Sequence, residues 1–218
     1  MNKEASMNDY IKLSSKRFND VILRVVPGHF VTPNSHTNYF MDMSAIMRRQ
    51  KEAKAAAKAL AQFYSTDTVV DSIVCLDGMD VIGAYMADEL TSAGILSKNA
   101  HKTMYILQPE HDSNGHMIFR DNIAGWIRYK NVLLLLSSVS TGKSVMQAVN
   151  AITYYGGTVT GVSALFSLVD SVDNFPVHAL FNKNDIPDYR SHDAHDCPLC
   201  RAHEKVDAII NGYGFSRL

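Results

Sequence analysis

The sequence predicts an α/β fold with a Rossmann-like central parallel sheet flanked by helices. A buried strand over residues 69–76 is followed by a tight loop and an amphipathic helix over residues 81–93. The same order recurs where an apolar strand over residues 132–136 leads through a loop into a helix over residues 145–155. The apolar run is typical of a parallel strand covered on both faces. Such an order predicts right-handed crossovers and ligands at the carboxyl ends of the strands.

Composition places the chain among globular proteins and excludes several classes of partner. It has 218 residues, 46% of them hydrophobic, which is enough for one core. A net charge of -1 gives no bulk attraction to nucleic acid or to an anionic membrane. No apolar run is long enough to span a bilayer, and the polar N-terminus lacks a signal-peptide hydrophobic region, so we expect a cytoplasmic protein. The three cysteines are too few for a secreted disulfide framework.

The first 43 residues are expected to form a helix and a small hairpin. Residues 1–26 carry apolar side chains at roughly helical spacing, and Pro27 with Gly28 ends the pattern. Residues 29–43 contain a turn signal at Pro33 and Asn34 and then alternate like a strand. Residues 44–174 are expected to form the α/β core, and residues 175–218 an irregular C-terminal tail.

The helix that opens the core follows Ser44, which can cap it. It contains strong helix formers and an apolar stripe, and we interpret its lysines and arginines as a solvated face. After the next strand comes the loop Asp77-Gly78-Met79-Asp80. From the residues alone, Asp77 is a turn former and Asp80 a helix N-cap.

The stretch from Asn131 to Ser144 joins a buried strand to a helix through a loop of hydroxyl side chains. Ser137, Ser138, Ser140 and Thr141 supply hydroxyls, Gly142 permits a tight turn, and Lys143 and Ser144 open the helix. The unpaired N–H groups and the positive end of the helix dipole attract an anion, so this loop is predicted to bind phosphate. A Walker A loop is an alternative, but Ser137 stands where that motif needs its first glycine.

The loop resembles the phosphoribosyl diphosphate (PRPP) loop of type I phosphoribosyltransferases. In that family four apolar strand residues lead into two acids, two variable positions and T-T-G-x-[ST]. Ser140, Thr141, Gly142 and Ser144 fill the phosphate-binding part, whereas the two acids are replaced by Leu136 and Ser137. The order of elements over residues 29–168 also resembles that of orotate phosphoribosyltransferases, with a hood, a pyrophosphate loop, a lid over residues 108–131 and then the PRPP loop.

This resemblance implies a role for each matching segment. The residues implied to bind the 5-phosphate are Ser138, Val139, Ser140, Thr141, Gly142, Lys143 and Ser144. Ser137 is implied to meet the ribose, and Asp77, Gly78 and Met79 the pyrophosphate. Tyr39 and Phe40 are implied to lie near the base, although ordinary sheet packing explains such a pair equally well. The resemblance further implies Mg²⁺ bound with PRPP and a homodimer, and it identifies no catalytic residue.

The tail contains a possible metal site. Cys197 and Cys200 form a C-x-x-C pair, which is half of a zinc knuckle, and His192 and His195 lie close by in the sequence. Two thiolates and two imidazoles would complete a tetrahedral Zn²⁺ site. A pair of reduced cysteines without metal is the alternative.

Two functions follow from these observations. The first is transfer of a phosphoribosyl group to a pyrimidine base such as orotate, and the second is a catalytically degenerate module that senses a phosphoribosyl ligand. An NTP-hydrolysing P-loop protein is a third class. The partners expected are small molecules and a second copy of the chain, with no nucleic acid and no membrane.

Overall fold

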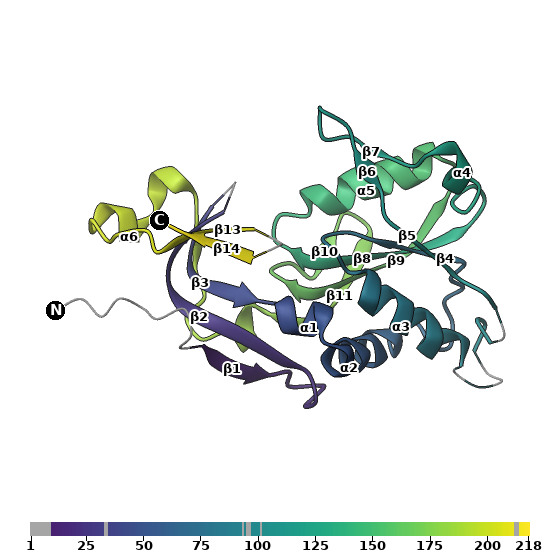
Figure 1. Ribbon diagram of the computed structural model, residues 1–218, viewed down its shortest axis with the longest axis horizontal. Helices are drawn as coiled ribbons and strands as arrows, with labels where there is room; N and C mark the ends of the chain where they lie inside the picture. The colour runs from purple at the N-terminus through teal and green to yellow at the C-terminus, as the bar shows by residue number, and fades with distance from the viewer. Residues whose placement is uncertain (1–9, 33–34, 93, 95–96, 101, 212–213) are drawn as a thin grey trace.

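A computed structural model describes residues 10–32, 35–92, 94, 97–100, 102–211 and 214–218. It contains an α/β core with a predominantly parallel sheet, which confirms the predicted fold class. A second sheet, which we call the hood, lies beside the core and includes the C-terminal strands (Figure 1). None of the described helices combines the length and the apolar character that crossing a bilayer requires.

The core sheet has the strand order β10-β11-β9-β8-β4-β5. All its neighbouring strands are parallel except β10 and β11, which pair antiparallel. Its strands are β4 (Ser72–Cys75), β5 (Tyr105–Leu107), β8 (Asn131–Val139), β9 (Thr158–Ser167), β10 (Ser171–Val172) and β11 (Phe175–Asn182). Its helices are α1 (Ser44–Arg48), α2 (Gln50–Ala61), α3 (Asp80–Thr91), α4 (Asp121–Ala124) and α5 (Lys143–Tyr154).

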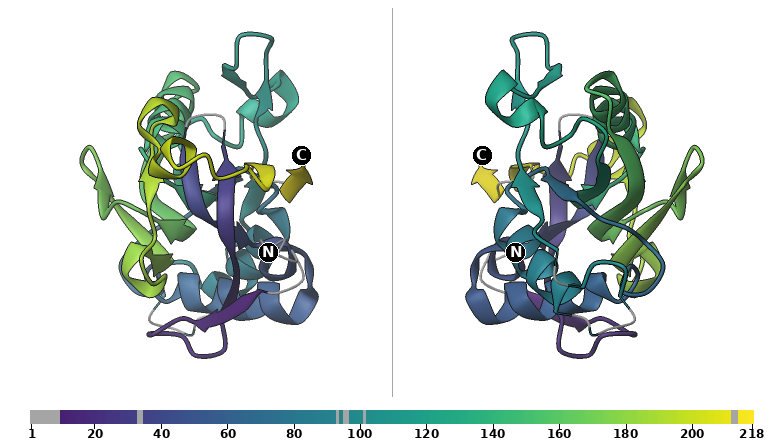
Figure 2. Two further views of the ribbon diagram at one scale, coloured as in Figure 1. Left: turned by 90° about the vertical axis from the view of Figure 1, so that its left-hand side faces the viewer. Right: turned by 90° about the vertical axis from the view of Figure 1, so that its right-hand side faces the viewer.

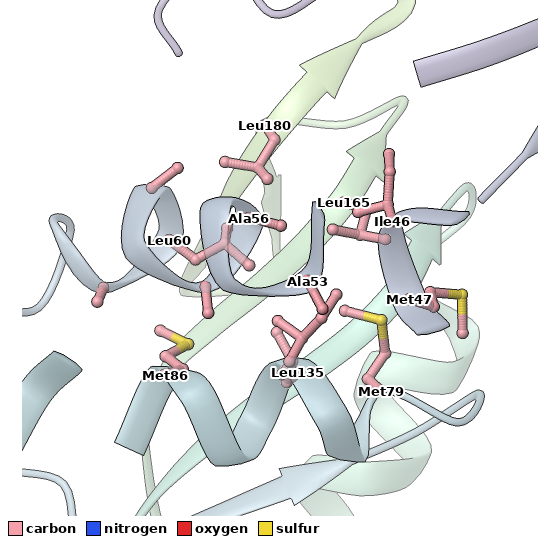
Figure 3. Close-up of a cluster of buried hydrophobic side chains, with 14 of the residues drawn as sticks. Ile46, Met47, Ala53, Ala56, Leu60, Met79, Met86, Leu135, Leu165 and Leu180 are labelled. Carbon is pink, nitrogen blue, oxygen red and sulfur yellow. The ribbon is translucent and has the colours of Figure 1, made fainter. Parts of the chain in front are cut away.

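The apolar side chains of β8 pack on both faces of the sheet. Leu133 and Leu135 pack in a cluster with α2 and α3, whereas Leu134 and Leu136 pack in a cluster with α5. Figure 3 shows α1, α2 and α3 side chains gathered around Leu135. All four leucines are at most 1% exposed, and burial of each contributes about 1.5–3 kcal/mol. Strand β8 is therefore held on both sides, which fixes the loop that follows it.

The hood sheet has the order β12-β3-β2-β13-β14, with β1 paired to β2. Strand β13 runs parallel to β2, and the other pairs are antiparallel. Its strands are β1 (Ile11–Ser14), β2 (Ile22–Val31), β3 (His36–Asp42), β12 (Ser191–His192), β13 (Ala208–Asn211) and β14 (Gly214–Arg217).

The helix predicted over residues 1–26 is wrong for the part that the structure describes, which forms β1 and the first half of β2. Leu23 and Val25 are fully buried, whereas Ile22 is exposed. Burial at the start of β2 therefore alternates with a period of two residues, as in a strand. The helical spacing was a coincidence of a few apolar positions. The predicted turn residues Pro33 and Asn34 lie outside the described residues.

The predicted boundary at residue 175 and the irregular tail are also wrong. Strand β11 is part of the core sheet, because Leu180 and Phe181 are buried against β9 and α2. Strands β13 and β14 belong to the hood, where β13 pairs with β2. The remaining short elements are β6 (Glu110–His111), β7 (Met117–Ile118), η1 (Lys183–Asp185), η2 (Ala194–Asp196) and α6 (Pro198–Arg201).

Candidate functional site

A cavity of about 430 Å³ lies where the core meets the hood. The end of β8, the loop after it and the start of α5 supply one continuous part of its lining, residues 136–145. The hood contributes Thr32, Thr37 and Phe40, and α1 contributes Arg48. Figure 2 views the molecule from its two ends, with the hood toward the viewer in the left panel and the core toward the viewer in the right panel. The cavity thus opens at the carboxyl end of a central parallel strand, where α/β proteins bind ligands.

The structure brings the whole predicted phosphate loop to this cavity, since Ser137 and all seven residues from Ser138 to Ser144 line it. Gly142 is the N-cap of α5 and has a φ of 80°. A Cβ on Gly142 would lie 2.6 Å from Cγ2 and 2.7 Å from Cγ1 of Val172. Both the backbone conformation and the lack of space therefore require glycine here.

The loop presents groups that suit an anion. Ser138, Ser140, Thr141 and Ser144 are exposed. Gly142 has no side chain to occupy the first N–H groups of α5, so they remain available to a ligand. Lys143 is exposed on the first turn, and Arg48 adds a second cationic side chain to the lining. The arrangement can hold a phosphate through backbone donors, hydroxyls and positive charge.

Asp77 reaches this loop from the neighbouring strand β4. The Ser137 backbone N–H and hydroxyl donate to Asp77 Oδ2 over 3.2 and 2.9 Å. Asp77 has a φ of 55° and Gly78 a φ of 76°, so the chain turns sharply and directs the carboxylate toward β8. Asp77 is the only carboxylate among the described residues that line the cavity.

The other residues of the predicted pyrophosphate loop lie elsewhere. Met79 is fully buried in the core cluster, and its N–H donates to Leu76 O over 3.0 Å (Figure 3). Gly78 does not line the cavity. The predicted contact of Met79 with pyrophosphate is therefore wrong, because its side chain and N–H are both used by the fold. The helix N-cap is also Met79, rather than the predicted Asp80.

The structure places Tyr39 and Phe40, the two residues predicted to lie near a base, in different surroundings. Phe40 lines the cavity, whereas Tyr39 packs against the main core cluster. Phe166 and Tyr189 add two rings to the lining, with centroids 5.7 Å apart and an edge-on arrangement. Burial raises the pKa of Tyr189 to about 12, so its hydroxyl stays protonated at neutral pH.

Sequence reasoning missed Tyr189 and Arg48. Tyr189 lies in the segment that was interpreted as an irregular tail, and no local pattern distinguishes it. Arg48 was interpreted as part of a solvated helix face. In the structure α1 ends at Arg48, and Arg49 is extended before α2 begins, so Arg48 is placed beside the cavity.

The segment predicted to be a lid forms a small hairpin, β6–β7, that projects from the core near α5 (Figure 1). None of the described residues between 108 and 131 lines the cavity. Within the hairpin, Asp112 accepts from the N–H of Asn114 and of His116, and Arg120 Nη2 pairs with Glu110 over 2.6 Å. Arg120 is thus engaged by Glu110 of the same segment.

The structure also corrects the predicted metal ligands. Cys197 and Cys200 lie together with His29 and His36, and the four possible ligand atoms are all within 4.8 Å of one another. His192 and His195 do not belong to this group. His192 is opposite His36 in the β12–β3 ladder, and His195 is exposed in η2. The ligand set therefore depends on long-range pairing of the hood with the tail.

Comparison with known proteins finds similarity to phosphoribosyltransferases. No protein-family model matches the sequence. The orotate phosphoribosyltransferase of Thermus thermophilus is 25% identical over 189 residues, which cover 85% of this chain and 93% of that protein.

Three solved structures share the fold. Orotate phosphoribosyltransferase from Mycobacterium tuberculosis has a TM-score of 0.52 and 15% identity, over 75% of this chain and 91% of that one. Adenine phosphoribosyltransferase from Trypanosoma brucei also has a TM-score of 0.52 and 15% identity, over 83% and 79%. Leishmania donovani UMP synthase has a TM-score of 0.55 and 13% identity over 73% of this chain, which spans only 34% of that longer protein.

Proposed function

We propose that this chain, which is a relative of the type I phosphoribosyltransferases, binds PRPP in its cavity and transfers the phosphoribosyl group to a nitrogenous base. One observation carries the proposal: the loop from Ser138 to Ser144 lines the cavity at the N-terminus of α5. The 5-phosphate is seated there on backbone N–H groups and hydroxyls. Lys143 and Arg48 balance its charge.

The ribose hydroxyls are assigned to Asp77. In the family motif, carboxylates at the end of the strand before the PRPP loop hold these hydroxyls, but Leu136 and Ser137 stand in their place. Cys75 of β4 is in register with Leu135 of β8, so Asp77 and Ser137 each follow that pair by two residues. Asp77 thus brings a carboxylate from the adjacent strand to the position where β8 has none.

Ser137 orients this carboxylate by donating twice to Oδ2. Oδ1 accepts from no group of the described chain, and it is the oxygen we assign to a ribose hydroxyl. A hydrogen bond from a hydroxyl to a charged carboxylate contributes about 1.5–3 kcal/mol when it is shielded from water. This contribution favours a sugar phosphate over inorganic phosphate.

The base is assigned to the apolar part of the cavity, where Phe40, Phe166 and Tyr189 present their rings. A planar base packs well against such rings, and the protonated Tyr189 hydroxyl can donate to a base carbonyl. Orotate is the first candidate, because the Thermus thermophilus relative carries that name. Adenine is the second, because the Trypanosoma brucei structure with the same fold is an adenine phosphoribosyltransferase.

The residues present also fit Mg²⁺. This ion is usually held by one or two carboxylates together with substrate phosphates, and Asp77 is a single carboxylate beside the phosphate loop. When bound, Mg²⁺ would neutralise charge on the departing pyrophosphate.

The main part of the protein in this reaction is to position the reactants. A base nitrogen forms a bond to C1 of the ribose while the bond from C1 to the pyrophosphate oxygen breaks. The pyrophosphate leaves with the electron pair, and the proton of the base N–H is released to solvent. The loop and Asp77 hold the ribose at both ends, so C1 stays aligned between base and leaving group. The surrounding apolar side chains exclude water that would otherwise attack C1.

A second function, a binding module without turnover, is favoured by two specific observations. Leu136 is buried against α5, so it gives the ribose no polar partner. The described part of the β6–β7 hairpin does not line the cavity either. If the hairpin acts on the reaction, it does so in a second copy of the chain, and we accordingly propose a homodimer, to be tested by analytical ultracentrifugation.

Isothermal titration with PRPP, ribose 5-phosphate and inorganic phosphate, with and without Mg²⁺, tests binding. Lys143→Ala should weaken all three ligands, whereas Lys54→Ala, an exposed lysine of α2 away from the cavity, should leave them unchanged. Asp77→Asn should weaken ribose 5-phosphate by about tenfold and spare inorganic phosphate.

Pyrophosphate release in the presence of PRPP and either orotate or adenine then separates the two functions. Release with one base supports the transferase and names its substrate. Tight PRPP binding without release supports the binding module. ATP binding that Lys143→Ala abolishes, with no binding of ribose phosphates, would contradict both.

A further inference from the structure

We propose that His29, His36, Cys197 and Cys200 form a structural Zn²⁺ site that joins the hood to the C-terminal segment. All four groups belong to described residues, and their possible ligand atoms lie within 4.8 Å of one another. His29 and Cys197 are only 2% and 1% exposed. Nothing in the phosphate-binding cavity requires this cluster, since none of its four residues lines that cavity.

The distances match a tetrahedral ion. Ligands at about 2.3 Å for sulfur and about 2.0 Å for nitrogen lie about 3.3 to 3.8 Å from one another around tetrahedral zinc. His29 Nε2 lies 3.1 Å from His36 Nδ1 and 3.6 Å from each of the two cysteine sulfurs. His36 Nδ1 lies 3.3 Å from Cys200 Sγ. These four separations are close to those expected around a tetrahedral ion, and the other two are at most 4.8 Å.

A hydrogen bond determines which ring nitrogen of His29 carries the lone pair. Its Nδ1 lies 3.1 Å from the backbone carbonyl of Glu204. A carbonyl only accepts, so Nδ1 carries the hydrogen, and in the neutral ring Nε2 presents its lone pair to the centre of the cluster. Such an outer partner is usual for a metal-binding histidine, because it sets the tautomer and the orientation of the ring.

The backbone around His29 is held just as firmly. The N–H of His29 donates to Asp207 Oδ2 over 2.8 Å, and the N–H of Asp207 donates to the carbonyl of His29 over 2.8 Å. A Cβ on Gly28 would lie 2.6 Å from Asp207 Oδ2, so glycine allows this close approach. The tail is therefore held at His29 by contacts that do not involve the four possible metal ligand atoms.

The two cysteines sit on a turn suited to metal. Cys197 is the N-cap of α6, Pro198 is its first residue, and Cys200 follows in the same turn. Backbone hydrogen bonds from Arg201 to Cys197 and from His203 to Cys200 close the turn. Both sulfurs then face the same point, as in the C-x-x-C half of a zinc knuckle.

Four protein ligands leave no open position, so the ion is structural rather than catalytic. It would tie two hood strands, β2 and β3, to a segment more than 160 residues further along the chain, since Cys200 and His36 are 164 positions apart. Thr32, Ser35 and Thr37 lie close to His36 in sequence and line the cavity. The metal therefore stabilises the hood wall of the cavity.

Zinc content of the purified chain, reconstituted with Zn²⁺ and freed of loosely bound metal, tests the site. We expect one Zn²⁺ per chain by mass spectrometry of the metal. Cys200→Ser should abolish this content, and His192→Ala, which removes the histidine opposite His36, should preserve it. A wild-type chain without zinc, or equal loss in His192→Ala and Cys200→Ser, would overturn the proposal.

Cobalt substitution of the wild-type chain keeps the test decisive if Cys200→Ser does not fold. Co²⁺ in a site with two thiolates and two imidazoles should give intense tetrahedral d–d bands and a thiolate charge-transfer band. Weak bands of octahedral type, without charge transfer, would refute the site. Chelation of Zn²⁺ should also lower the thermal midpoint of the wild type, because metal binding contributes directly to the free energy of folding.

Discussion

Gly142→Ala is the substitution that probes the phosphate loop most sharply. It adds one methyl group at a residue with a φ of 80°, where the new Cβ would meet both γ-methyl groups of Val172. The left-handed backbone costs about 1–2 kcal/mol for an L-residue, and overpacking costs about 1–3 kcal/mol. We therefore expect the free energy of unfolding to fall by about 2–5 kcal/mol, or the loop to move away from Val172.

Gly115→Ala is the matched control. Gly115 has a φ of 81° in the β6–β7 hairpin, but a Cβ there meets nothing within 4 Å and the residue does not line the cavity. It should cost only the backbone contribution of about 1–2 kcal/mol. Ribose 5-phosphate affinity should fall at least tenfold in Gly142→Ala and stay unchanged in Gly115→Ala.

A double substitution separates the clash from the backbone strain. Val172→Ala removes both methyl groups that the new Cβ would contact. In urea unfolding, Gly142→Ala should therefore cost about 1–3 kcal/mol less in the Val172→Ala background than alone. Equal costs in the two backgrounds, or wild-type affinity for ribose 5-phosphate in Gly142→Ala, would refute the reasoning.

Two further substitutions test the polar contacts around the core. Ser137→Ala removes the hydroxyl that donates to Asp77. It should weaken binding of ribose 5-phosphate about fivefold, or by about 1 kcal/mol, in isothermal titration. An unchanged affinity would contradict the assigned ribose contact. Burial opposes ionisation of Asp71, but hydrogen bonds from the backbone and side chain of Asn131, together with Lys102 and Lys130, outweigh it and lower the pKa of Asp71. This contribution to stability is complete above the pKa of the unfolded chain and is lost as pH falls through the lower pKa of the folded chain. The stability difference between wild type and Asp71→Asn in urea should therefore be largest near pH 7 and shrink below about pH 4, whereas a constant difference would contradict the linkage.

The core and the position of the loop between β8 and α5 could be predicted from the sequence because both depend on local patterns. The apolar run of β8 and the glycine at the start of α5 are read directly from neighbouring residues. Gly142 was expected to permit a tight turn, and its φ is indeed positive. The position of Ser138 to Ser144 at a cavity follows from the rule that ligands bind at the carboxyl ends of parallel strands.

The C-terminal strands of the hood, and the grouping of His29 and His36 with the two cysteines, could not be predicted because they depend on contacts between distant segments. The pairing of β13 with β2 brings the tail to His29, and no sequence spacing shows that pairing. Nearness along the chain favoured His192 and His195 instead. The same limit applies to Tyr189, which reaches the cavity only through the course of the segment after β11.

The register between β4 and β8 explains why Asp77 was given a different partner. Its loop resembled a pyrophosphate loop, and the sequence alone offered a turn former as the alternative. Only the paired strands show that its carboxylate meets Ser137. Under the proposed function, the ribose contact is made by Asp77 after β4 together with Ser137 of β8, whereas the family motif places both acids on one strand.

A crystal structure of the chain soaked in PRPP and Mg²⁺ tests the central claim most directly. The account predicts electron density for the 5-phosphate within hydrogen-bond distance of the backbone N–H groups around Gly142, with a ribose hydroxyl on Asp77. A ligand bound elsewhere while this loop stays empty, at a PRPP concentration that saturates the protein in solution, would contradict it.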